Sequence, residues 1–229
     1  MSTADRRDRR VAAACLASAA GLAIAGFTAL GSVFDYPQIL DEPTGDILAL
    51  YRAHRAAVSG WFLVLVVGAA LLAPAGVLLG RLVGGRLGRW IAGVGIAAAV
   101  VQAVGLSRWV LVVPWLPADA GGRHTFELLH TWLGQVLGET VGYALTATFT
   151  VLVVVGLDRA GAPRWLAWLG AAAAVLIATG VLIPAGVDAA SLTNFAGYVL
   201  WCGWLLCLSA VLWTTRGSSA RIAASPPGR

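Results

Sequence analysis

Charged residues are scarce in this chain, and lysine is absent. Asp, Glu, Lys and Arg make up 12% of the 229 residues, against about 25% in an ordinary soluble domain. Hydrophobic residues account for 59%. Such a chain cannot cover itself with polar side chains in water, so its surface is expected to face membrane lipid. The net charge of +5 comes from arginines at the ends of apolar runs. Membrane topology explains these arginines, and we expect no nucleic-acid partner.

The chain also lacks the motifs of disulfide frameworks and metal sites. Its three cysteines, Cys15, Cys202 and Cys207, lie in apolar segments, and no CxxC or Cys/His cluster occurs. This pattern predicts buried, small hydrophobic side chains. The three histidines have no HExxH or similar spacing, so we expect neither a metal nor another cofactor.

Six apolar runs are long enough to cross a bilayer, which requires about 20 helical residues. They are predicted at 11–34, 58–79, 90–113, 133–157, 165–183 and 195–213. The first run is too long for a signal peptide and is expected to be retained. Polar helical extensions are predicted before the second run, at 46–57, and before the fourth, from Arg123. The fold class is therefore all-α, a single six-helix transmembrane domain over 1–213. The tail at 214–229, rich in Ser, Pro and Gly, is predicted to be disordered.

The distribution of arginine predicts the orientation of this bundle. If the N-terminus is inside, twelve of the sixteen arginines fall on inner segments, whereas the outer segments are acidic. We therefore expect both termini in the cytoplasm and a multi-pass protein of the bacterial plasma membrane. The arginines that remain outside this pattern are Arg52, Arg55, Arg108 and Arg123.

Glu139 is the most unusual residue of the predicted spans. It lies roughly two turns inside the fourth span, where an ionisable side chain is costly and usually functional. A carboxyl group at this depth is expected to be either paired or kept protonated. Arg108, near the outer end of the third span, is predicted at a similar depth. The two residues either form an ion pair that fixes helix register or line a cavity that opens to the outer side.

The fourth span carries two different stripes at helical spacing. Thr131, Gln135 and Glu139 are i, i+4 neighbours and predict a polar face. Gly134, Gly138 and Gly142 form a GxxxGxxxG pattern, which lets another helix approach closely. We therefore expect one polar face and one face for a helix-packing partner.

Further polar and aromatic residues are predicted at the outer ends of the second, third, fourth and sixth spans. They indicate either a substrate-binding site or an ordinary solvated interface with an aromatic belt. We predict Glu139 as the catalytic residue. The predicted substrate-binding residues are Arg108, Arg52, Arg55, His54, Gln135, Trp109, Trp132, His130, Asn194, Tyr198 and Trp201.

Four stretches of the chain carry aromatic, proline and glycine motifs. They are Phe34-Asp35-Tyr36-Pro37 with Glu42-Pro43-Thr44-Gly45, the run from Gln102 through Gly105 and Arg108-Trp109 to Val113-Pro114, the run from His130 through Gly134 and Gly138-Glu139 to Gly142-Tyr143, and Gly197-Tyr198-Val199-Leu200-Trp201. With these motifs the chain, from roughly Val11 to Trp213, resembles an actinobacterial family of six-span membrane proteins of unknown function. The resemblance implies the six-span fold and no activity. A likeness to small integral-membrane terpene cyclases, which are similar in size and entirely helical, has no motif behind it and is an analogy that rests on an acid in the membrane beside aromatic side chains.

Three functions are compatible with these residues. We favour an enzyme acting on a lipid-soluble, isoprenoid-like substrate, in which Glu139 is the general acid for a cyclisation or isomerisation. Aromatic faces would stabilise a cationic intermediate. The alternatives are a proton-coupled transporter, with Glu139 as proton site, and a non-catalytic lipid-binding or partner subunit. The inner halves of the spans are almost wholly apolar, which argues against a conducting route.

Overall fold

The computed structural model describes residues 3–214, apart from the side chain of Asp188, and this part of the chain is helical without strands. It contains six helices long and apolar enough to cross a membrane, which confirms the predicted all-α, six-span fold. The spans are Thr3–Phe34, Arg55–Val83, Gly85–Trp115, Ala120–Arg159, Arg164–Ala185 and Ala189–Thr214. The predicted disordered tail lies outside the described residues, except for Thr214 at the end of the last helix.

The first and last spans are single α-helices, α1 (Thr3–Phe34) and α9 (Asp188–Thr214), whereas the spans between them are interrupted. The second consists of α3 (Arg55–Ala70) and α4 (Leu72–Val83). The third is α5 (Gly85–Leu111) followed by the 3₁₀ turn η2 (Val113–Trp115). The fifth is α8 (Arg164–Ala178), which continues as the 3₁₀ helix η4 (Thr179–Ala185). Pro74, Pro114 and Pro184 lie in α4, η2 and η4, and each lacks the N–H that a regular helix needs.

The fourth span differs most from a regular α-helix. It begins as α6 (Ala120–Leu129) and ends as α7 (Gly142–Arg159). Between them lies η3 (His130–Val141), a π-helix of 12 residues. π-helical segments are rare, and they frequently occur at functional sites. The predicted polar extension and the predicted span are therefore both helical, but the π-helix covers the end of the extension and the first nine residues of the predicted span.

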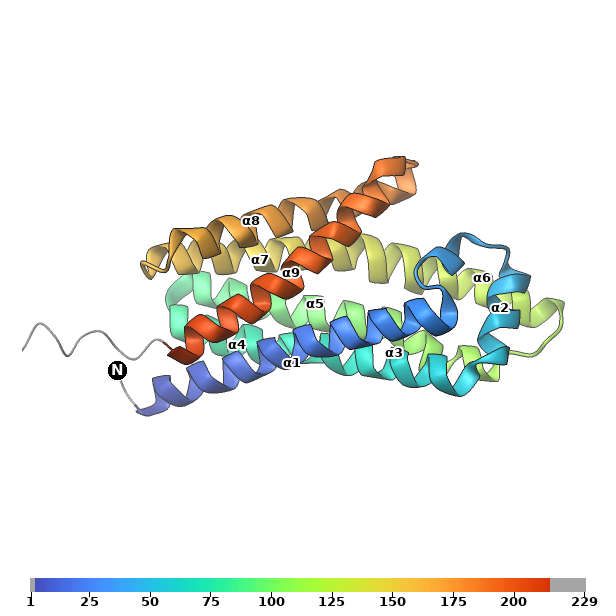
Figure 1. Ribbon diagram of the computed structural model, residues 1–229, viewed down its shortest axis with the longest axis horizontal. Coiled ribbons are helices and arrows are strands. Elements are labelled where there is room, and N and C mark those ends of the chain that lie inside the picture. The colour runs from blue at the N-terminus through green and yellow to red at the C-terminus, as the bar shows by residue number, and fades with distance from the viewer. Residues whose placement is uncertain (1–2, 215–229) are drawn as a thin grey trace, which may run out of the picture.

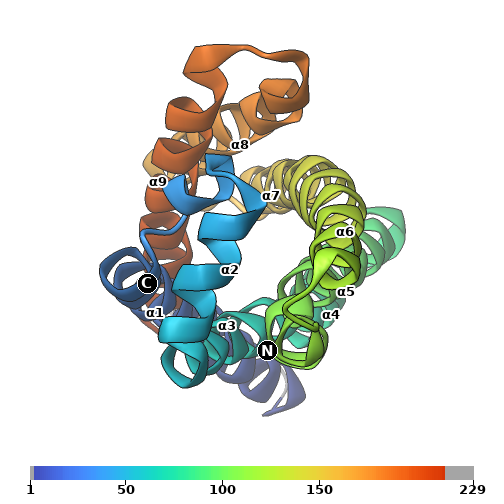
Figure 2. The same ribbon diagram turned by 90° about the vertical axis from the view of Figure 1, so that its right-hand side faces the viewer.

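The spans form a closed ring in which each packs against its neighbours. α1 contacts α3 and α4, these contact α5, and α5 contacts η3 and α7. α7 then contacts α8, α8 contacts α9, and α9 returns to α1. Figure 2 shows this ring along its axis. Both ends of the described chain lie at one end of the bundle, and the short helices η1 (Gln38–Asp41), α2 (Thr44–Ala53) and α6 lie at the other (Figure 1). We call these the terminal end and the distal end.

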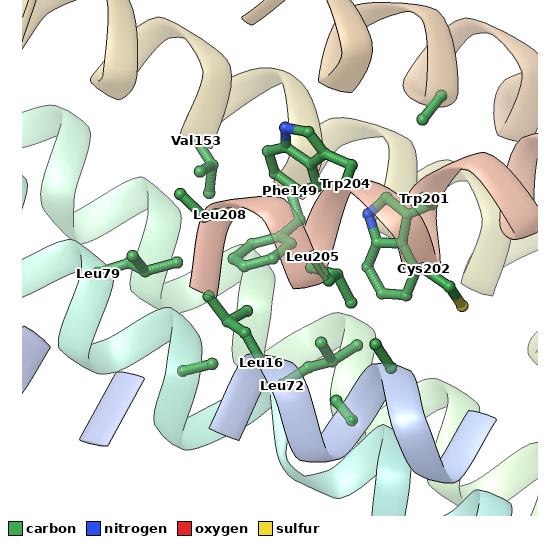
Figure 3. Close-up of a cluster of buried hydrophobic side chains, with 14 of the residues drawn as sticks. Leu16, Leu72, Leu79, Phe149, Val153, Trp201, Cys202, Trp204, Leu205 and Leu208 are labelled. Atoms are coloured by element: carbon green, nitrogen blue, oxygen red, sulfur yellow. The ribbon is translucent and has the colours of Figure 1, made fainter. Parts of the chain in front are cut away.

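A hydrophobic core fills the ring towards its terminal end. Leu16 of α1, Leu72 of α4, Phe149 of α7 and Leu205 of α9 are buried together there (Figure 3). Trp204 is fully buried in the same core, and its indole N–H donates a hydrogen bond to the Leu166 carbonyl at 3.0 Å. Lipid tails are as apolar as these side chains, so close van der Waals packing stabilises this part of the bundle.

A second core, mostly aromatic, lies at the distal end. The rings of Phe62 and Trp109 stack with centroids 5.0 Å apart, and Phe34 meets Trp109 edge-on at 5.1 Å. The hydroxyl of Ser59 donates to the Trp109 carbonyl at 3.0 Å and lies 2.7 Å from the hydroxyl of Tyr51. These contacts fix the short helix α2 and the second and third spans to one another.

Helices α1 and α9 touch near the terminal end and separate towards the distal end (Figure 1). The hydroxyl of Ser209 donates to the carbonyl of Ala13 at 2.8 Å, close to the terminal end. Nearer the distal end, α9 is attached to the fifth span instead. Asn194 donates to the Ile177 carbonyl at 2.8 Å, and the Thr179 and Thr193 hydroxyls lie 2.7 Å apart. The distal half of α9 therefore follows the fifth span rather than α1.

Candidate functional site

Arg108 lies inside the bundle, where α5 carries its side chain towards η3. Its side chain is only 4% exposed. Nη1 donates a hydrogen bond to the Gly105 carbonyl of the same helix at 2.6 Å. Nε is buried and has no hydrogen-bond partner among residues 3–214. Removing a guanidinium ion from water costs on the order of several kcal/mol, and incomplete pairing leaves much of this cost uncompensated.

The glycine stripe of the fourth span makes room for this arginine and for its helix. A Cβ atom on Gly134 would lie 2.8 Å from Nη2 of Arg108. A Cβ atom on Gly105 would lie 2.8 Å from the Cα atom of Gly138, so α5 and η3 touch through their backbones. Gly142 lies against Gln102 of α5. The helix that the stripe approaches is therefore the third span of the same chain.

Glu139 lies on the π-helix η3 and is half-buried. Within the described residues, neither a hydrogen bond nor an ion pair joins it to Arg108, so the ion pair considered from sequence does not form. The two side chains are still close enough to interact through their charges. Arg108 donates to its own helix instead, and Glu139 has no hydrogen-bond or ion-pair partner among residues 3–214.

The winding of η3 changes which residues share a face with Glu139. The hydroxyl of Thr140 donates to the carbonyl of Gln135 at 3.0 Å, five residues back, as a π-helix allows. Thr131 and Gln135 are exposed, whereas Glu139 is half-buried. The predicted polar stripe therefore runs from two exposed positions to a half-buried one. The i, i+4 spacing aligns side chains on one face of an α-helix, whereas this segment is a π-helix.

Three tyrosines, Tyr36, Tyr143 and Tyr198, interact with the charge of Glu139, although the sequence predicted a role only for Tyr198. Tyr36 belongs to the turn after α1, and burial raises the pKa of its hydroxyl to about 12. The negative charge of Glu139 raises the pKa of Tyr36 further, and Arg108 opposes this effect. Tyr143, one turn beyond Glu139, also interacts with its charge, and its ring lies 5.6 Å from that of Tyr198. The i+4 spacing of Tyr143 from Glu139 was a usable signal, but no local spacing points to Tyr36.

Several predicted binding residues lie at the distal surface, away from this cluster. The exposed residues are Arg52 on α2, Arg55 on α3 and His54, which lies between these two helices. Arg52 donates to the Pro117 carbonyl at 3.2 Å, and the guanidinium of Arg55 lies 5.7 Å from the Trp115 ring. Gln135 and Trp132 are likewise exposed.

The remaining predicted residues are buried or half-buried and have structural contacts. Trp109 lies fully buried in the distal core. Trp201 donates through Nε1 to the Thr150 hydroxyl at 2.8 Å, and Asn194 holds the end of the fifth span. His130 stacks on Phe126 with centroids 5.7 Å apart.

Chemically, the cluster combines a carboxyl group, a guanidinium and phenol hydroxyls at membrane depth. It can transfer a proton and can bind an anion. No group of three His, Cys, Asp or Glu side chains in the described part of the chain is placed to hold a metal ion. Two surface grooves of about 590 and 330 Å³ lie at the terminal end, beside Arg86–Arg89–Trp90 and Arg6–Arg7–Arg10. A cavity next to Glu139 stays a prediction.

Comparison with known proteins identifies the family. The family model described as "Domain of unknown function (DUF4386)" matches residues 11–208, and the chain therefore belongs to this family. This result agrees with the predicted resemblance to a family of unknown function that covers most of the chain. No curated protein and no solved structure matches the chain, so the analogy with terpene cyclases has no support from these comparisons.

Proposed function

We propose that this DUF4386 protein is a membrane enzyme that transfers a proton to a lipid-soluble substrate, with Glu139 as the general acid. The observation that carries the proposal is the half-buried Glu139 carboxyl group, which has no hydrogen-bond or ion-pair partner among residues 3–214 and interacts electrostatically with Arg108, Tyr36 and Tyr143. An ionisable residue at this depth is costly, and a folded chain retains it where it has a task.

The proton transfer balances without a further reactant. The Glu139 O–H gives its proton to a carbon–carbon double bond, so that a C–H bond forms and a carbocation and a carboxylate remain. The cation rearranges or closes a ring and then loses a proton from an adjacent carbon to the carboxylate, which restores the acid. The aromatic rings of Tyr143 and Tyr198 lie close to this position and would stabilise positive charge. The products are isomers of the substrate, as expected for an isoprenoid-like cyclisation or isomerisation.

The packing of the helices bears on the route that a substrate or a proton could take. α1 and α9 separate towards the distal end (Figure 1), and Tyr36 and Tyr198 are half-buried. The opposite half of the ring is filled by the core around Phe149 and Trp204 (Figure 3). This filled core favours a site closed towards the terminal end over the alternative of a proton-coupled transporter, which needs a route across the whole bundle.

Solvent deuterium provides a test that does not require the substrate to be known. The purified protein is incubated in D₂O with a total lipid extract of the native membranes, and carbon-bound deuterium is measured by mass spectrometry after back-exchange in H₂O. We expect one or more lipids to gain deuterium with the wild type and not with Glu139→Gln. Glu127→Gln, which changes an exposed glutamate of α6, is the matched control and should behave like the wild type. Equal labelling with Glu139→Gln, or none with the wild type, rejects the proposal.

A further inference from the structure

We infer that Arg108 binds the anionic head group of an amphiphilic lipid, a carboxylate or a phosphate, in the distal half of the bundle. This inference names the chemical class of the ligand and so deepens the proposed function. It rests on that function in one respect, namely that the ligand is the substrate. The observations behind it are the hydrogen bonds, the neighbours and the burial of the Arg108 side chain.

The guanidinium of Arg108 has donors that the protein does not use. The group carries five N–H donors, but its only hydrogen bond within residues 3–214 is the one from Nη1 to the Gly105 carbonyl. Nε is buried without a partner. Nη2 also donates to nothing in the described chain, yet unlike Nε it is not completely enclosed. Nε and Nη2 form one edge of the guanidinium, and this edge matches the two oxygens of a carboxylate or phosphate.

The charge of Arg108 is also incompletely balanced. Glu139 is the nearby carboxyl group that interacts with it, and no ion pair joins the two within the described residues. Other groups that interact with its charge are the hydroxyls of Tyr36 and Tyr143, which are neutral near pH 7, and the imidazole of His130. The free energy of pairing with an anion is therefore much more favourable for this buried cation than for a solvent-exposed arginine.

A glycine of the neighbouring helix η3 leaves space for the guanidinium of Arg108. Gly134 lies directly against it, and any larger residue there would occupy the same volume. The ring of Trp109 lies 5.4 Å from the guanidinium carbon, so the cation is next to the distal aromatic core. This placement differs from an arginine that reaches the membrane surface to contact water, because its end is enclosed by other helices.

The position of Arg108 distinguishes a lipid from a small water-soluble anion. The residue lies in a span whose outward-facing side chains, such as Val100, Val104 and Leu111, are exposed and apolar. An anion at this depth is accommodated best when an apolar tail extends into the membrane. The ligand is therefore expected to enter tail and head together, and acetate or inorganic phosphate alone should bind far more weakly.

The experiment measures binding rather than turnover, using the full chain purified in a neutral detergent. The ligands are hexadecanoate, hexadecyl phosphate, methyl hexadecanoate, acetate and inorganic phosphate, and the readouts are the thermal unfolding midpoint and a calorimetric titration. We expect hexadecanoate, hexadecyl phosphate or both to bind and to raise the midpoint, and the uncharged ester to do neither. Preference between the two anionic lipids assigns the head group as a carboxylate or a phosphate.

Arg108→Gln should weaken binding of the anionic lipid by at least about tenfold, since a charge-assisted pair is lost. Arg123→Gln removes the same charge from the exposed surface of α6 and should bind like the wild type. Circular dichroism and gel filtration establish that each variant is folded. If Arg108→Gln does not fold, Arg108→Lys keeps the charge but loses the planar pair of donors, and it should still weaken binding.

Three outcomes overturn the inference. These are equal binding of the methyl ester and the acid by the wild type, absence of binding by both anionic lipids, and equal weakening by Arg108→Gln and Arg123→Gln. The result is independent of catalysis. If the anionic lipid binds through Arg108 but no deuterium is incorporated, the ligand class stands and the enzymatic proposal fails. If deuterium is incorporated without such binding, the enzymatic proposal stands and the ligand class is wrong.

Discussion

The hydroxyl of Tyr36 reports on Glu139 and Arg108 without any knowledge of a substrate. Burial raises its pKa from 10.0 to about 12, and Glu139 contributes in the same direction. The neutral phenol is thus favoured in the folded protein. Between about pH 10 and pH 12 the unfolded chain releases this proton first. The stabilising contribution is therefore complete below pH 10 and is lost as the pH rises towards 12.

We expect the phenolate absorbance assigned to Tyr36, obtained by subtracting the titration of Tyr36→Phe from that of the wild type, to appear near pH 12. Glu139→Gln should move this titration to lower pH, because a negative charge that opposes ionisation is removed. Glu127→Gln should leave it in place. A Tyr36 titration near pH 10, or one that does not respond to Glu139→Gln, would show that the two side chains are not neighbours in the membrane.

The sequence drew attention to two ionisable residues of this cluster but not to the residues around them. Glu139 and Arg108 stand out because an ionisable residue in an apolar run is visible without a structure. Tyr36 precedes Arg108 by 72 positions and Glu139 by 103, it lies in a turn, and only the closed ring brings it near them. Arg52, Arg55 and Trp132 are polar or aromatic residues near predicted span ends, and pattern alone cannot separate such interface residues from residues that point inwards.

At the scale of the element, the π-helix η3 is the feature that periodicity did not predict. The polar and glycine stripes were both predicted from the α-helical period. The composition of this segment does not distinguish the i→i+5 hydrogen bonds of a π-helix from the i→i+4 hydrogen bonds of an α-helix. The glycine pattern remained informative because close approach depends on the absence of side chains. Gly134, Gly138 and Gly142 all contact α5, although the helix that carries them changes its winding.

The contact between α5 and η3 gives a prediction about stability. Gly105→Ala places a methyl group 2.8 Å from the Cα atom of Gly138 and 3.0 Å from the Leu133 carbonyl. Both neighbours are backbone atoms, so the two helices must separate, and overpacking of this kind costs about 1–3 kcal/mol. We expect a clearly lower thermal unfolding midpoint in detergent.

Gly93→Ala is the matched control for this substitution, because it lies on the same helix α5 and an added Cβ meets nothing within 4 Å. Its midpoint should be unchanged or slightly higher, since alanine favours a helix. Equal midpoints for Gly105→Ala and Gly93→Ala would mean that α5 and η3 are not in backbone contact. A loss of Arg108-dependent lipid binding by Gly105→Ala would connect this helix contact to the site.

At the scale of the whole molecule, six spans followed directly from hydropathy, whereas the order of the ring did not. Length and apolarity determine whether a run crosses a bilayer. Which spans are neighbours depends on contacts between distant parts of the chain, such as the hydrogen bond from Ser209 to Ala13. The position of the site in one half of the ring also depends on this closure. The terminal half is filled by Phe149, Trp204 and Leu205, and Tyr143 and Tyr198 of the polar cluster pack against this core.

The orientation in the membrane determines which compartment is nearer to Glu139, and the arginine distribution predicts that the distal end is outside. Ala118 lies in the exposed distal turn before α6, and Ala160 lies in the exposed turn between α7 and α8 at the terminal end (Figure 1). Single cysteines at these positions, in a background with Cys15, Cys202 and Cys207 replaced by alanine, report the two sides. In intact cells a membrane-impermeant maleimide should label Ala118→Cys and not Ala160→Cys, and permeabilisation should expose both. The reverse pattern would place Glu139 nearer the cytoplasm, so that its carboxyl proton would exchange with water inside the cell. Because the proposed reaction returns the proton to Glu139 in each cycle, the chemistry would survive that result, but the topology argument from arginine would not.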